Sequence, residues 1–112
     1  MIINHEWQRE QILILLRNYI KRIKRGRIAE EYEAALDDFL EQLGNGQQSI
    51  NYRQDENSLL NVIIKEALSM GRGGNIRNNQ TQNLLQAVAT LYYDNTGEWP
   101  DQLSLSSKLN FR

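Results

Sequence analysis

Apolar residues recur at intervals of three and four along most of this chain, and short glycine-containing breaks interrupt the pattern. This spacing places apolar side chains on one face of an α-helix, whereas a half-buried strand alternates apolar and polar residues. No segment sustains such alternation. The sequence therefore predicts an all-α protein, a small bundle of four to five helices.

Each expected helix is bounded by residue types that start or stop helices. We expect four helices, over residues 5–24, over residues 27–43, from Asp55 or Asn57 to Gly71, and from Asn79 to Asp94. Pro100 and Asp101 can open a short fifth helix, because proline suits the first helical turn. The polar segment 47–54 is expected to be a loop.

With 112 residues the chain is expected to be a single domain, residues 1–112, with a flexible joint near residues 71–78. A chain of this size can bury a modest core. We select as core the residues at the centres of the apolar stripes. They are Leu13, Leu16, Ile20, Tyr32, Leu36, Phe39, Leu40, Leu60, Ile63, Ile64, Leu84, Leu85, Val88 and Leu91.

The composition points to a reducing compartment. The chain has no cysteine, which excludes disulfides and thiol catalysis. Its longest apolar run, Ile12 to Leu16, is far too short to cross a membrane, and no signal-peptide core follows Met1. We therefore expect a cytoplasmic protein that makes no membrane contact.

Catalytic groups are scarce. His5 is the only histidine, and we expect it to be solvated at a frayed terminus. It has no second histidine or cysteine with which to hold a metal. The glycines at 71–74 lack the Gly-Lys-Ser/Thr of a phosphate-binding loop and follow a helix, not a strand. We expect no enzyme, no cofactor, no metal site and no small-molecule substrate.

The charges are segregated, although the formal net charge is only −1. A basic run ends the first expected helix, and acids crowd the second. The candidate contacts to nucleic acid are Arg17, Lys21, Arg22, Lys24, Arg25 and Arg27. The candidate contacts to a protein partner are Glu30, Glu31, Asp37 and Asp38.

Two functions fit this pattern. The first is a small module, a subunit or accessory factor, whose basic helix contacts a phosphate backbone without reading bases. The alternative is a protein-interaction module, such as an adaptor, a scaffold or a phage-type inhibitor, that uses its acidic helix. A continuous basic stripe on the surface would favour nucleic acid, and a basic helix covered by the acidic one would favour a protein partner.

Self-association is also expected. The run from Ile12 to Leu16 carries apolar side chains around most of a helix, and a chain this short has little material with which to cover them all. An uncovered apolar patch would be an interface. The sequence therefore predicts a homodimer or a complex with another protein.

The last residues resemble the start of the winged helix-turn-helix of LexA-type repressors. The resemblance rests on Thr96-Gly97-Glu98-Trp99-Pro100, followed by Leu105, Leu109, Asn110, Phe111 and Arg112 at similar spacing. It implies a partial helix-turn-helix, because the base-reading helix would begin where the chain stops. Residues 16–22 are similar to a helix of GINS replication subunits, and residues 79–94 to one of the small helical subunit of type III CRISPR complexes. These short windows assign no family.

Overall fold

The protein is an all-α bundle. The computed structural model describes residues 1–23, 29–72 and 79–101, and these form four helices. The helices are α1 (Glu6–Ile23), α2 (Glu30–Gly44), α3 (Glu56–Arg72) and α4 (Asn79–Thr96). Beyond Pro100 and Asp101, where the fifth helix was expected to open, that helix and the second half of the LexA-like segment lie at 102–112, outside the described residues.

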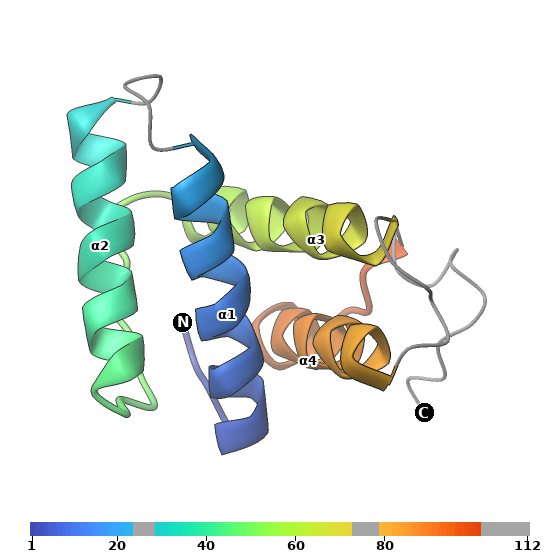
Figure 1. Cartoon of the computed structure of the whole chain (residues 1–112). Helices are drawn as coiled ribbons and strands as arrows, with labels where there is room; N and C mark the ends of the chain where they lie inside the picture. Colours follow the sequence, from blue (N-terminus) through green and yellow to red (C-terminus); the bar gives the residue numbers. More distant parts are fainter. Residues whose placement is uncertain (24–28, 73–78, 102–112) are drawn as a thin grey trace.

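The helices form two antiparallel pairs that cross steeply (Figure 1). One pair is α1 with α2, the other is α3 with α4, and in this view α3 passes behind α1. Helix α1 contacts each of the other three helices. The core lies between the pairs, so one side of α1 faces inwards and the opposite side faces away from the bundle.

Of the fourteen residues predicted for the core, ten are buried. The other four, Leu13, Ile20, Tyr32 and Leu40, are partly buried at its edge. On α1, Ile12 and Leu15 are also fully buried, although neither was among the predicted core residues. The run Ile12–Leu16 is not covered on all sides, as expected for so short a chain, because Ile14 is 53% exposed. The three neighbouring helices do not close around the full perimeter of α1.

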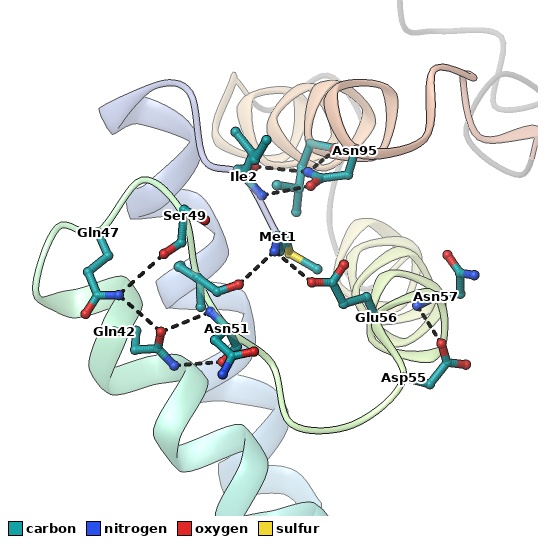
Figure 2. Close-up of polar contacts among 12 residues, drawn as sticks. Met1, Ile2, Gln42, Gln47, Ser49, Asn51, Asp55, Glu56, Asn57 and Asn95 are labelled. Atoms are coloured by element: carbon teal, nitrogen blue, oxygen red, sulfur yellow. Dashed lines mark hydrogen bonds and ion pairs between the residues drawn. The ribbon is translucent and has the colours of Figure 1, made fainter.

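The N-terminal segment is paired, not frayed as predicted. The Ile3 amide donates to Gln48 O at 2.8 Å, and the Ile50 amide donates to Met1 O at 2.7 Å. The Met1 amino group also donates to the Ile50 carbonyl and to the Glu56 carboxylate, at 2.7 Å each (Figure 2). The polar segment 47–54 is a loop, as predicted, but its Ile50 is buried under this contact.

Two buried polar residues near the start of α1 fix its position. Gln8 is fully buried, and its amide nitrogen donates to Thr90 Oγ1 at 2.9 Å and to Asp94 Oδ2 at 3.1 Å on α4. The Arg9 guanidinium donates from one nitrogen to Leu43 O at 2.8 Å and to Gln47 O at 2.9 Å. A cation at the Leu43 carbonyl satisfies the C-terminal end of α2 and complements its dipole, and the bond to Gln47 O holds the following loop against α1.

The described part of the LexA-like segment is a turn that ends α4. Gly97 has φ +80°, which favours glycine, and its amide donates to Tyr93 O at 2.8 Å. The Tyr93 and Trp99 rings stack with centroids 4.4 Å apart, on either side of this turn. These contacts explain the helix end and do not establish a helix-turn-helix.

Candidate interaction surface on helix α1

The predicted basic cluster is only partly described. Arg17, Lys21 and Arg22 lie on the last turns of α1, and all three are exposed. The other three predicted contacts, Lys24, Arg25 and Arg27, lie outside the described residues.

Arg22 is bound by a residue of the same chain. Its guanidinium forms an ion pair with Glu66 of α3, a residue that is 3% exposed. The hydrogen bond to Glu66 raises the pKa of the Arg22 guanidinium above its ordinary value. The guanidinium also lies over the Tyr19 ring, 5.6 Å from its centroid. Arg22 is thus bound within the bundle, and sequence reasoning missed Glu66, whose only signal was an acid between the apolar positions Ile63 and Ala67.

Arg17 and Lys21, by contrast, have no acidic partner within ion-pair distance among the described residues. Both line a depression of about 530 Å³ between α1 and α2. Its other lining residues are Ile14, Asn18, Ile20, Asp37 and Leu40. The depression therefore joins two cations and one carboxylate to exposed apolar surface.

The predicted acidic contact residues differ in whether they have polar partners within the chain. Glu30, Glu31 and Asp37 are exposed along α2 and form no ion pair with a described residue. Asp38 accepts a hydrogen bond from Gln42 Nε2 at 3.0 Å and lies 3.8 Å from Arg53 Nε. In the described part of the chain, the acidic helix therefore lies beside the basic end of α1 without neutralising Arg17 or Lys21.

The side of α1 that faces away from the bundle carries a regular stripe. Trp7, Gln11, Ile14, Asn18 and Lys21 follow one another at spacings of four, three, four and three. This spacing puts them on one face of a helix. Trp7 is 44% exposed and Ile14 53% exposed, although both are large and apolar. We call these five residues, together with Glu10 and Arg17 along one edge, the outer face of α1.

Hollows border the outer face on both sides. The 530 Å³ depression lies towards α2. Towards α4, Trp7 and Gln11 line a second depression of about 350 Å³ with Asn83 and Gln86. A third of about 300 Å³ continues beside Gln11 and Ile14. The outer face is therefore a ridge between two grooves. Its spacing is visible in the sequence, but its exposure depends on which helices pack on α1.

Groups suited to chemistry do not converge elsewhere in the described residues. His5 stacks on Trp7 with centroids 5.5 Å apart. Burial raises the pKa of the Tyr32 phenol and of the Tyr52 phenol above the ordinary value. No cluster of three or more histidine, cysteine or carboxylate side chains that could hold a metal occurs among the described residues. None of the described helices combines the length and apolar character needed to span a membrane.

Comparisons with known proteins add no assignment. No protein family, curated protein or solved structure matches this chain.

Proposed function

We propose that this protein is a non-catalytic protein-interaction module whose contact surface is the outer face of α1. The observation that carries the proposal is the exposure of Trp7 and Ile14 on a helix whose opposite side forms the core. Large apolar side chains that remain exposed along one face of a helix mark binding surfaces more often than scattered ones do.

The surroundings of these two residues support the same function. Protein interfaces combine an apolar centre with a polar and charged rim, and tryptophan often contributes much of their binding energy. Here Ile14 is the centre, and Glu10, Arg17 and Lys21 are exposed around it. The grooves on both sides offer space for side chains of a partner.

The proposal is tested by capture with matched baits. The tagged protein, a Trp7→Ala variant and an Ile14→Asp variant are each used to capture binding proteins from extracts of the source cells. The control bait is Asn61→Asp, an exposed position on α3. We expect proteins captured by the wild type and the control to be lost with both α1 variants. Identical capture by all four baits would contradict the proposal.

A second candidate function is contact with a nucleic-acid backbone, as the basic run suggests. It is favoured by one observation, the exposure of Arg17 and Lys21 without an acidic partner among the described residues. Contact through these two cations alone would give a slope of about −1.8 in log K against log salt with duplex DNA. Fluorescence polarisation with single- and double-stranded DNA and RNA, with Arg17→Glu/Lys21→Glu as the comparison, tests it. Binding unchanged by that charge reversal would exclude this contact.

A further inference from the structure

We propose that the outer face of α1 binds the same face of a second copy of this chain, with the two helices antiparallel and a two-fold axis beside Ile14. The inference rests on the proposed function, because it names the partner of that surface. An interface with two-fold symmetry must be self-complementary, so that each group on the face meets its complement when the face is reversed. The order of residues along α1 meets this condition.

The ends of the face are complementary. Trp7 precedes Ile14 by seven residues and Lys21 follows it by seven. At a rise of about 1.5 Å per residue, each lies about 10.5 Å from the centre. The two-fold axis therefore brings Trp7 of one copy opposite Lys21 of the other, twice in the dimer. An ammonium group over an indole ring is a favourable cation–π contact, and Lys21 forms no ion pair with a described residue that would compete.

The charged edge is complementary in the same way. Glu10 and Arg17 are seven residues apart, nearly two turns, and so lie on the same edge of α1. Glu10 lies four residues before Ile14, and Arg17 lies three residues after it. The axis therefore brings Glu10 of one copy to within about one residue of Arg17 of the other. Both side chains are exposed and neither is in an ion pair with a described residue. The dimer would contain two such ion pairs.

The polar residues of the face also match. Gln11 and Asn18 lie three residues before and four residues after the centre. Reversal places the amide of Gln11 against the amide of Asn18, and each can donate to the other's carbonyl oxygen. The Asn18 nitrogen already donates weakly to Glu66 at 3.4 Å, which leaves its oxygen as an acceptor. Ile14 meets Ile14 of the second copy at the axis.

The grooves beside the ridge extend the contact beyond a single pair of helices. Stable dimers usually bury about 1,200–2,000 Å² in total, so residues of neighbouring elements must contribute. Leu40 of α2 borders the groove on one side, and Asn83 and Gln86 of α4 border the groove on the other.

A single cysteine tests the position of the axis. The chain has no native cysteine, so an Ile14→Cys variant carries one thiol per copy. Two Cα atoms must lie about 4.4–6.8 Å apart for a disulfide to form, and equivalent residues meet so closely only beside a two-fold axis. Under mild oxidation we expect a covalent dimer from Ile14→Cys and almost none from the exposed control Asn61→Cys. Equal yields from the two variants, or no dimer from Ile14→Cys, would overturn the proposed axis.

A charge exchange tests the identity of the partner. Glu10→Arg alone, or Arg17→Glu alone, replaces two attractive pairs by repulsive ones and should weaken dimerisation roughly tenfold. The double variant Glu10→Arg/Arg17→Glu restores both pairs in reversed order, so its dimerisation constant should return to within about threefold of the wild type. Sedimentation equilibrium measures the constants, and circular dichroism verifies that each variant is folded. A wild type that stays monomeric at high micromolar concentration, or a double variant weaker than both single variants, would overturn the inference.

The experiments distinguish failure of the proposed interaction function from failure of the proposal that the partner is a second copy. A monomeric wild type whose capture of another protein still requires Trp7 and Ile14 would retain the interaction function and remove the second copy as partner. Rescue by the double charge exchange supports the second copy directly, because a different partner would not carry the exchanged charges.

Discussion

Arg22 at the surface of α1 forms an ion pair with Glu66, a carboxylate buried under it on α3. The two residues are unequally placed, because the Arg22 side chain is 57% exposed and the Glu66 side chain only 3%. An arginine that the sequence presents as one of a surface cluster is therefore the principal partner of a buried charge. The only other described side chain bonded to Glu66 is Asn18, at 3.4 Å.

We expect Arg22→Ala to lower the free energy of unfolding by about 1–3 kcal/mol, because it leaves the buried Glu66 carboxylate with only the weak Asn18 contact. The matched control is Lys21→Ala, the preceding residue, which has no ion pair with a described residue and should change stability by less than about 0.5 kcal/mol. Urea denaturation at low micromolar protein concentration measures both on the monomer, so that the proposed dimer contact of Lys21 does not contribute. Equal effects of the two substitutions would show that the ion pair contributes nothing specific.

Among the charged residues, Arg9 should be the one whose replacement lowers the free energy of unfolding most. Arg9→Ala removes one hydrogen bond to a carbonyl at the end of α2 and one to the loop that follows it, and should cost about 2–4 kcal/mol. Arg9→Lys keeps the charge but not the planar guanidinium, so it should recover only part of that loss. Thermal unfolding of the two variants and the wild type gives the comparison. Full recovery by lysine would show that charge alone suffices at this position.

The adjacent residues Ile14 and Leu15 should respond very differently to truncation. Leu15 is fully buried, so Leu15→Ala should cost about 2–5 kcal/mol. Ile14→Ala removes exposed apolar surface and should change the stability of the monomer by less than about 1 kcal/mol. Urea denaturation at low micromolar concentration makes the comparison. Similar losses would mean that Ile14 is covered.

The regular parts of this fold were predictable where one face of a helix is polar. In α2, Leu36 and Phe39 were correctly placed in the core because acids occupy the opposite side. In α1, apolar residues fill every position from Ile12 to Leu16, so their spacing does not show which side of the helix is buried. The predicted core therefore lacked Ile12 and Leu15, which are fully buried. Which of those side chains stays exposed depends on three helices that pack from different directions, and local sequence does not contain that information.

Contacts between distant segments were not predictable in the same way. Ile50 lies in a polar loop and is buried because Met1 and Ile3 pair with that loop. The Arg22–Glu66 pair joins residues 44 positions apart. For the candidate surface, the sequence indicated that Arg17 and Lys21 lie near each other on a helix. The depression that they line also requires Leu40 and Asp37 of α2, whose packing on α1 is set by the core.

Tyr52 gives a prediction that depends on pH. Its hydroxyl is buried without a hydrogen-bonding partner among the described residues, so Tyr52→Phe should be neutral or stabilising by up to about 1 kcal/mol at pH 7.

Burial raises the pKa of this phenol in the folded protein above its ordinary value of 10.0. A raised pKa stabilises the folded state below pH 10, and that stabilisation is lost as pH rises further, because the unfolded phenol ionises first. Between pH 9.5 and 11, roughly the range around that ordinary value, the wild type should lose stability faster than Tyr52→Phe. Urea denaturation across this range measures the difference, and parallel curves would show that Tyr52 ionises equally easily in both states.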